Sequence, residues 1–463
     1  MKLKRLTIAL FSAMLLVSCG GSKKIVTTYP PAPAWVKDRP VSSGYYIGVG
    51  SARKTADINQ TQQNAKQNAL ADMASDISVN ISTNSLLSTF ENSSNFSEDF
   101  SKTIKAQAEQ DLEGYETVGN YEDQNNYWIY FRLSKADYQR IKEERRSKAV
   151  TIALDLFDKG VNAEKIGDVR LAFISFIKAL EPLKPYFADP LQVQYQGKDI
   201  YLGNEISKEI SGLLSSIRIE ASNRQIKVKQ GQPLAIGSLE FKVSYKNGQP
   251  LNGLTLSGTY TEKPLRTSKI LTDNNGLASF TIDAIRSNKN TETLNATLNL
   301  ENIANEATTD FIIRKLFVRF RAPEASISIN IIKPLFYITS TESNLDAKLN
   351  PAPISEGLKR KILEGGYSTS DKEMEADYRI SIIASTKSKG EVGNYKQTIL
   401  NATISVKDKS GMEVYTKQLD NIMGAHFDYQ QAGMEAYKEA VKKFENTISR
   451  EIIEVVVKGK SNY

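Results

Sequence analysis

The sequence predicts a multidomain α+β fold, and three observations lead to that prediction. The chain has 463 residues, enough for about three or four domains of ordinary size. The spacing of its apolar residues alternates between the helical period and the strand period. The Pro30–Pro33 run cannot form a core and is typical of a semi-stiff spacer. We therefore expect this order of segments: an N-terminal segment at 1–18, a tether at 19–33, an α+β domain at 34–146, a helical segment at 147–220, a β-sandwich at 221–314 and an α/β domain at 315–463.

The start of the chain has the layout of an export signal. Basic residues precede an apolar run at 6–17, shorter than the ~20 residues of a membrane-spanning helix. The motif at 16–20, LVSCG, resembles the bacterial lipobox, which implies cleavage before Cys19 and lipidation of that residue. Several acyl chains, at about 0.8 kcal/mol per buried CH₂, hold a protein firmly in a bilayer. Gly20 stands where an aspartate would mark inner-membrane retention, so the resemblance implies the outer membrane, and we expect its periplasmic face.

The composition argues against several classes of function. The formal net charge of +7 becomes +4 once the three cations of the signal peptide are removed. No basic run interleaves with aromatic residues after the signal, so we expect no nucleic-acid partner. Cys19 is the one cysteine and His426 the one histidine, which leaves no disulfide, thiol nucleophile or histidine-rich metal site. Because no Gly-x-Ser-x-Gly sequence accompanies His426, we interpret it as a surface or loop residue and expect no enzyme, metal or cofactor.

An ordered series of elements follows the tether. An Ala34-Trp35-Val36 opening precedes a strand at 45–52 that carries two glycines. A helix begins near Asp57 with small residues along one face, and alternation at 77–81 predicts a further strand. Two more strands are expected around a polar turn at 123–126. The elements together predict a small α+β domain.

This order of elements resembles the LPP20 lipoprotein family. The resemblance covers residues 34–146. It implies an α+β domain found on outer-membrane lipoproteins, some of which are linked to flagellar or envelope structures. It implies no catalytic residues.

One motif in this domain is similar to a phosphate-binding loop. The segment 48–55, GVGSARKT, lies between strand and helix, and its Lys54 and Thr55 suit such a loop. Arg53, however, stands where a Walker loop or a dinucleotide fingerprint needs glycine. We therefore interpret the glycines as forming a tight strand-to-helix turn.

The middle of the chain changes from helix to strand. Residues 149–183 predict a helix, a turn at Gly167 and a second helix, and they resemble one tetratricopeptide repeat. A lone repeat cannot bury its own faces, so we expect the amphipathic stretch 206–217 to cover it. Structural packing is the interpretation of this segment, with a peptide-binding groove as the alternative.

The strand period and recurrent turns from residue 221 predict the β-sandwich. The turns at 247–251 and 272–278 resemble those of immunoglobulin-like modules of bacterial surface proteins. Asp273 lies among asparagines, which leaves a calcium loop as an alternative to a plain turn, although clustered carboxylates are missing.

The last predicted domain mixes both element types and vaguely resembles the α/β domains of envelope lipoproteins such as curli-secretion and flagellar accessory proteins. Residues 452–457 fit either a closing strand or the end of the last helix. The other expected elements are a strand at 327–331, a helix near 354–363, strands at 378–384, 397–406 and 412–419, and a helix at 432–450.

Three functions are compatible with these features. The first is a non-catalytic scaffold or accessory protein of an envelope assembly, attached to a bilayer through Cys19 and bound to other envelope proteins. The second is a ligand-binding surface module centred on residues 222–315. The third is a hydrolase of cell wall or glycan, which needs two carboxylates at a set separation. Its candidate residues are Glu373 with Glu375, or Glu91, Glu98 and Asp99. The modular architecture favours the first function.

Overall fold

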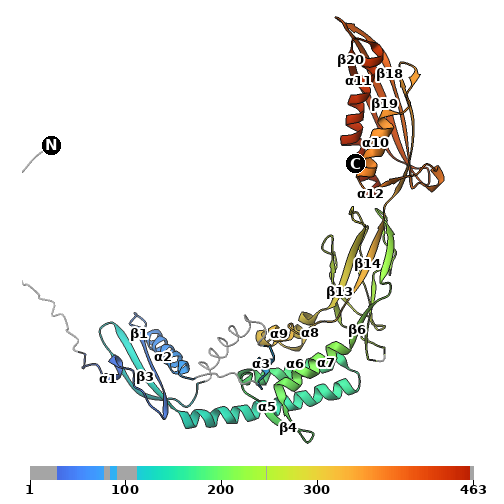
Figure 1. Ribbon diagram of the computed structural model, residues 1–463. Helices are drawn as coiled ribbons and strands as arrows, with labels where there is room; N and C mark the ends of the chain where they lie inside the picture. The colour runs from blue at the N-terminus through green and yellow to red at the C-terminus, as the bar shows by residue number, and fades with distance from the viewer. Residues whose placement is uncertain (1–28, 78–83, 91–111, 247, 459–463) are drawn as a thin grey trace, which may run out of the picture. The chain divides into compact units, whose positions relative to one another are not determined.

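The computed structural model describes residues 29–77, 84–90, 112–246 and 248–458 (Figure 1). These residues form helices and several separate β-sheets, so the predicted multidomain α+β class is confirmed. The chain divides into two compact units: unit 1 comprises residues 1–81 and 90–147, and unit 2 comprises residues 82–89 and 148–463. No helix within the described ranges is long and apolar enough to cross a membrane.

Unit 1 is a three-stranded antiparallel sheet with one long helix packed against it. The strand order is β1-β3-β2, so β3 is central and β1 lies at an edge. Helix α2 packs on β1 and β3. The predicted strand at 77–81 falls on residues 78–81, outside the described ranges. The elements are α1 (Ala34–Lys37), β1 (Tyr45–Arg53), α2 (Ile58–Ser75), β2 (Glu116–Glu122) and β3 (Asn126–Ser134).

Two glycines of β1 allow α2 to lie close to the sheet. A Cβ on Gly48 would be 2.1 Å from the carbonyl oxygen of Ala69, and one on Gly50 would be 2.3 Å from that of Ala65. The helix presents Ala65, Ala69 and Met73, all buried, along this face. The prediction that these glycines form a strand-to-helix turn is wrong. They lie inside the strand, where the helix backbone leaves no room for a side chain.

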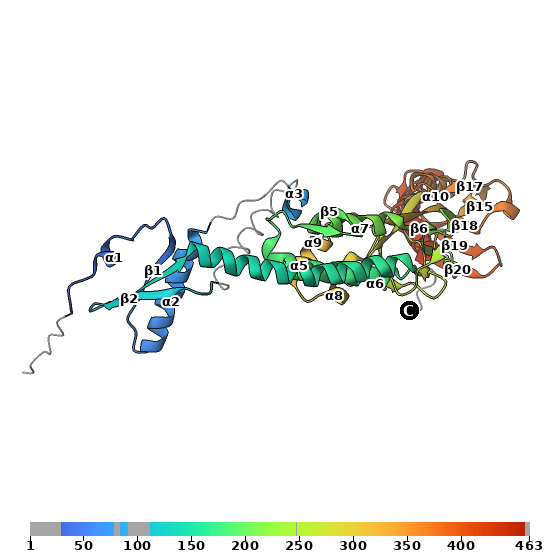
Figure 2. The same cartoon turned by 90° about the horizontal axis from the view of Figure 1, so that it is seen from below.

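Helices make up most of the next part of the chain. Gly167, with a φ of 80°, ends the turn after α5, and the carboxylate of Asp168 caps α6. A Cβ on Gly160 would be 2.5 Å from the ring of Phe176, so α5 and α6 pack closely, and α7 lies against α6 (Figure 2). The predicted boundary at 146/147 lies one residue from the division between the two units, and α5 continues across it without a break. The elements are α3 (Leu86–Phe90), α5 (Lys135–Lys165), α6 (Val169–Leu183), the 3₁₀ turn η1 (Lys184–Tyr186), β4 (Gln192–Tyr195), β5 (Lys198–Tyr201) and α7 (Leu202–Ser216).

Two sheets face each other in the next part of unit 2. One has the order β11-β10-β13-β14-β7 and the other the order β12-β8-β6, with β9 on β8. The ring of Phe280 fills the space between the sheets: a Cβ on Gly258 would be 2.4 Å from it, and its centroid is 5.9 Å from that of Phe241. The strands are β6 (Ile217–Ala221), β7 (Gln225–Lys229), β8 (Glu240–Tyr245), β9 (Gln249–Pro250), β10 (Thr255–Tyr260), β11 (Lys269–Leu271), β12 (Leu277–Ser279), β13 (Thr291–Leu298) and β14 (Glu324–Ile332).

This pair of sheets differs from the predicted range of 221–314. Strand β14 lies in the range predicted for the C-terminal domain, yet it pairs with β13 and, in parallel, with β7. Between β13 and β14, the helices α8 (Leu300–Ala307) and α9 (Phe311–Phe317) pack on α6, and the rings of Phe173 and Phe317 are 5.9 Å apart. The alternation of apolar and polar residues identified β14 as a strand. It could not identify the strands that pair with β14, because they are distant in sequence.

The C-terminal part is one mixed sheet covered on one face by helices. Its order is β16-β15-β18-β19-β20, with β17 on β15, and β15 runs parallel to β18. Alternate strand residues are buried against α10 and α11, which carry the buried Leu358 and Tyr437. Residues 452–457 are helical, so the strand alternative for them is wrong, because Ile452 and Val456 continue the apolar face of the preceding helix.

The three longest strands extend beyond their predicted ends. The elements are β15 (Leu335–Asn344), β16 (Ala347–Lys348), α10 (Pro353–Glu364), β17 (Ser368–Thr369), the 3₁₀ turn η2 (Glu373–Glu375), β18 (Tyr378–Val392), β19 (Tyr395–Asp408), β20 (Glu413–His426), α11 (Tyr429–Lys443), the π-helical turn η3 (Phe444–Ile448) and α12 (Ser449–Lys458).

Candidate functional site

The carboxylates of Glu373 and Glu375 form separate ion pairs on the surface. Glu373 Oε1 is 3.0 Å from Nε of Arg379, and Glu375 Oε1 is 3.0 Å from Nζ of Lys372. Their side chains are 56% and 52% exposed. Each carboxylate therefore faces its own cation and solvent. The other proposed residues, Cys19, Glu91, Glu98 and Asp99, lie outside the described ranges.

His426 lies at the end of β20 beside an aromatic ring. Its ring centroid is 5.8 Å from that of Phe427. Its Nδ1 is buried and has no hydrogen-bond partner in the described part of the chain. A catalytic histidine of the hydrolase type needs an acidic group that orients Nδ1, and none is in place here among the described residues. Across those residues, no cluster of three His, Cys, Asp or Glu side chains could hold a metal ion.

The residues of the other two candidate sites, the loop similar to a phosphate-binding loop and the possible calcium loop, already bind groups of the protein itself. The ammonium of Lys54, in the segment similar to a phosphate-binding loop, is 3.0 Å from the carboxylate of Glu122 on β2. The hydroxyl of Thr55 donates to the carbonyl oxygen of Asp57, 2.9 Å away. Asp273 accepts from two backbone N–H groups of its own turn, each at 2.8 Å, as in a plain Asx turn.

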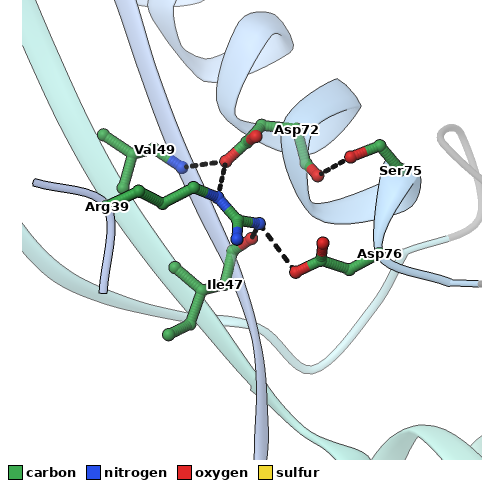
Figure 3. A network of polar contacts seen from close by, with 6 residues as sticks. All are labelled: Arg39, Ile47, Val49, Asp72, Ser75 and Asp76. Carbon is green, nitrogen blue, oxygen red and sulfur yellow. Dashed lines mark hydrogen bonds and ion pairs between the residues drawn. The ribbon is translucent and has the colours of Figure 1, made fainter. Parts of the chain in front are cut away.

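Arg39 joins the segment before β1 to helix α2 (Figure 3). Its Nε donates to Oδ2 of Asp72 at 2.9 Å, and its Nη2 donates to Oδ2 of Asp76 at 2.7 Å. The same Nη2 donates to the carbonyl oxygen of Ile47 at 2.7 Å. Oδ2 of Asp72 also accepts from the backbone N–H of Val49 at 2.9 Å. We call these five residues the Arg39 clasp.

The charge of Arg39 balances an unfavourable pair of aspartates. Asp72 and Asp76 lie one helical turn apart at the C-terminal end of α2, where the helix dipole disfavours negative charge. Burial opposes the charge of Arg39, but its hydrogen bonds to Asp76 and Asp72 raise its pKa, so the guanidinium remains a cation. The ion pairs therefore stabilise this end of α2.

The Arg39 clasp also completes the hydrogen bonding of an edge strand. The carbonyl of Ile47 and the N–H of Val49 point away from β3, toward the edge of β1 that pairs with no described strand. Arg39 binds the first group and Asp72 the second. An exposed edge strand has unpaired backbone N–H and C=O groups that can pair with another chain. These two side chains bind such groups and so protect the edge of β1 against that pairing.

The end of the predicted tether and the residues that follow it make further contacts with unit 1. The ring of Trp35 is 5.6 Å from that of Tyr130. The ammonium of Lys54 lies 4.8 Å from the ring centroid of Tyr29. Together with Arg39, these contacts fix residues 29–39 to the folded unit.

Most of these contacts lie in a stretch of the chain that matches a known protein family. Residues 33–131 match the LPP20 lipoprotein family. The match confirms the resemblance predicted for the N-terminal domain, and it supports a membrane-anchored lipoprotein of the cell envelope. No curated protein matches the chain.

Several solved structures are similar to part of the chain. A minor lipoprotein from Acinetobacter baumannii is 12% identical, with 27% of this chain and 92% of that chain covered and a TM-score of 0.18. Lipoprotein GNA1162 from Neisseria meningitidis is 12% identical, with 25% and 97% covered and a TM-score of 0.18. The hypothetical protein CT253 from Chlamydia trachomatis is 12% identical, with 25% and 98% covered and a TM-score of 0.19.

The Arg39 clasp, which lies in the stretch that matches the LPP20 lipoprotein family, was not predicted from the sequence. Asp72 and Asp76 are 33 and 37 residues away from Arg39 along the chain, and only the fold brings them to it. One signal was present, because Asp72 and Asp76 place two carboxylates at the wrong end of a helix for the dipole. That arrangement indicates a cation nearby, although it does not identify Arg39.

Two buried carboxyl groups in unit 2 were also missed. Glu292 on β13 is 2% exposed and accepts hydrogen bonds from Tyr260 and Ser287, and burial raises its pKa to about 7. Glu342 on β15 is 1% exposed and accepts from the first backbone N–H groups of α10. Burial raises the pKa of Glu342, and those N–H groups oppose the rise. The carboxyl group of Glu292 therefore links the stability of the β-sandwich to pH. The carboxyl group of Glu342 fixes the start of α10 to the sheet.

Proposed function

We propose that this chain is a lipid-anchored, non-catalytic scaffold or accessory protein on the periplasmic face of the outer membrane. Acyl chains on Cys19 hold it in the bilayer, and its folded modules bind other envelope proteins. The LPP20 match supports the anchored lipoprotein. The Arg39 clasp is the observation that carries the scaffold role.

The Arg39 clasp fixes the start of the fold to the rest of unit 1. A tether gives position to a protein only if the residue at its end is held by the fold. Here Arg39 binds α2 and β1 at the same time, and Trp35 packs on the sheet. Any pull on the lipidated end therefore reaches a helix and a strand together, which suits a protein that holds partners at a membrane.

Polar contacts within unit 2 connect its modules. Lys184 at the end of α6 pairs with Asp310, the N-cap of α9, and Arg170 pairs with Glu306 of α8. Lys229 of β7 pairs with Asp377 beside β18 at 2.8 Å. Such joints favour a rigid arrangement of binding surfaces over independently moving modules.

Membrane fractionation with crosslinking tests this proposal. The wild-type chain and a Cys19→Ala variant are crosslinked in intact cells, and the membranes are washed at high salt to remove peripheral proteins. We expect the wild type in the outer-membrane fraction with a defined set of envelope proteins, and the variant in the soluble envelope fraction. A variant that stays in the washed membrane, or a wild type that recovers only abundant porins, contradicts the proposal.

Zymography tests the non-catalytic part separately. Purified wild-type protein is assayed on several cell-wall and glycan substrates. We expect no clearing, because Glu373 and Glu375 are each occupied by a cation. Clearing that is lost in a Glu373→Gln variant would establish a hydrolase instead.

A further inference from the structure

Exposed apolar side chains gather at one end of the C-terminal sheet. Val392, Tyr395, Met423 and Phe427 are 61%, 50%, 49% and 63% exposed. The rings of Tyr395 and Phe427 stack with centroids 4.8 Å apart. We call these four residues the tip patch. Single exposed apolar residues are ordinary, but an exposed aromatic pair with further apolar side chains near it is typical of an interaction site.

The strand register, together with the stacking of Phe427 on Tyr395, places the tip patch on one face of the sheet. Val392 and Tyr395 are opposite each other at the β18–β19 turn, and Met423 of β20 is opposite Ile399 of β19. The other face is covered by α11, which lies so close that a Cβ on Gly424 would be 2.0 Å from a helix carbonyl. The tip patch therefore faces away from the core, and it is exposed because the helix covers only the opposite face of the sheet.

Lysines on the same face border the tip patch. Lys387 is opposite Ile399, and Nζ of Lys389 lies 3.1 Å from the sulfur of Met423. In the described part of the chain, neither lysine pairs with a carboxylate. Of the two nearby carboxylates, Glu391 pairs with Lys396, and Asp428, which caps α11, offsets one of the two lysines. The surroundings of the tip patch therefore carry a small net positive charge.

We infer that the tip patch binds the surface of an anionic lipid bilayer. Aromatic side chains favour the boundary between headgroups and acyl chains, and lysines lay their stems on apolar surface while their charges meet lipid phosphates. The charge is complementary to such a surface. A stable protein interface buries about 800 Å² per partner over some 20 to 30 residues, which is far more than four side chains and two lysines offer.

Vesicle binding tests the inference on the full chain with Cys19→Ala, so that no acyl anchor contributes. Sedimentation is measured with vesicles of phosphatidylglycerol and phosphatidylethanolamine, and with phosphatidylcholine alone. We expect salt-sensitive binding to the anionic vesicles. The double variant Tyr395→Ser/Phe427→Ser should bind at least about tenfold more weakly, because it removes most of the apolar contact area. Lys387→Gln/Lys389→Gln should lose roughly fivefold per lysine at low salt.

A matched control replaces two exposed apolar residues outside the tip patch. Ile383 and Met374 are 61% and 81% exposed, and Ile383→Ser/Met374→Ser should bind like the parent chain. Circular dichroism confirms that all variants fold. Equal binding by the tip-patch variant and its parent, or an equal loss in the control, overturns the inference. A concentration-dependent dimer that only the tip-patch variant loses would instead assign the surface to a second copy.

The inference does not rest on lipidation. Because the tested chain carries alanine at position 19, a failure to bind vesicles overturns the tip-patch proposal alone. The fractionation experiment tests separately whether the Cys19→Ala variant is released from washed membranes, and so whether Cys19 anchors the protein.

Discussion

Replacing Arg39 by methionine should destabilise unit 1 by about 2 kcal/mol. Methionine keeps much of the aliphatic stem but removes the donors to Asp72, Asp76 and the carbonyl of Ile47. The side chains of Arg39, Asp72 and Asp76 are 36%, 30% and 41% exposed. Because solvent screens them, the two ion pairs together contribute about 1 kcal/mol rather than the larger value of buried pairs. The bond to Ile47 adds about 1 kcal/mol.

Hydrogen exchange measures this loss where it occurs. The N–H of Val49 donates to Asp72, so its protection depends on an intact Arg39 clasp. A loss of about 2 kcal/mol corresponds to exchange roughly 30-fold faster in the peptide that contains β1. We expect the change in β1 and the C-terminal turn of α2, together with earlier proteolysis at residues 38–44.

Arg140 provides a matched control. It also contacts two carboxylates, Asp137 and Glu144, but all three side chains are more than half exposed and lie on one helix. Pairs of this kind contribute little, so Arg140→Met should change stability by less than about 0.5 kcal/mol. If the two methionine variants exchange at the same rate in β1, the Arg39 clasp has no special role in holding the tether to the fold.

Two further predictions concern packing and pH. Gly50→Ala should destabilise unit 1 by at least about 2 kcal/mol, because its Cβ meets the α2 backbone. Gly44→Ala, which meets nothing within 4 Å, is its control, and denaturant titration compares the two. Burial raises the pKa of Glu292 from 4.5 to about 7, so the folded state binds a proton that the unfolded chain releases between these pH values. The stability of unit 2 should therefore fall by about 2 to 3 kcal/mol as the pH rises through this window, and Glu292→Gln should abolish the fall.

Elements with local sequence signals were predictable. The start of α2 was expected near Asp57, whose carboxylate accepts from the N–H of Gln60 at 3.1 Å. The polar turn between β2 and β3 was expected at 123–126, and Asp123 accepts there from the N–H groups of Asn125 and Asn126. In both cases a side chain contacts the backbone within three residues, so the cause lies inside a short window of sequence.

Features that depend on distant partners were not predictable in the same way. The alternating apolar residues of β14 identified a strand, but its neighbours β13 and β7 lie on different sides of it in the sheet and far apart in sequence. Alternation carries no information about which strand pairs with which. The apolar spacing at 300–307 did contain the signal for α8, since Leu300, Ile303, Ala304 and Ala307 repeat at helical intervals.

The similarity to a phosphate-binding loop shows why a motif needs its structural context. Gly48 and Gly50 suited such a loop, but the structure uses both for close packing of α2 on β1. Lys54 also suited a phosphate-binding loop, but its ammonium pairs with the carboxylate of Glu122. A short pattern of glycines and a lysine therefore arises here from the packing needs of a sheet and a helix.

Lipid anchoring changes how strongly the tip patch must bind. Acyl chains on Cys19 would keep the protein at the membrane, so contact of the tip patch with that bilayer becomes an intramolecular event. Effective concentrations for tethered groups reach the millimolar range, and they fall as the flexible part of a tether lengthens. A tip patch that binds vesicles only weakly is therefore sufficient in the anchored protein. The Arg39 clasp contributes because it joins the residues that follow the predicted tether to α2 and β1. Arg39→Met should accordingly leave vesicle binding of the Cys19→Ala chain unchanged, since the clasp and the tip patch belong to different units and the clasp makes no part of the lipid contact.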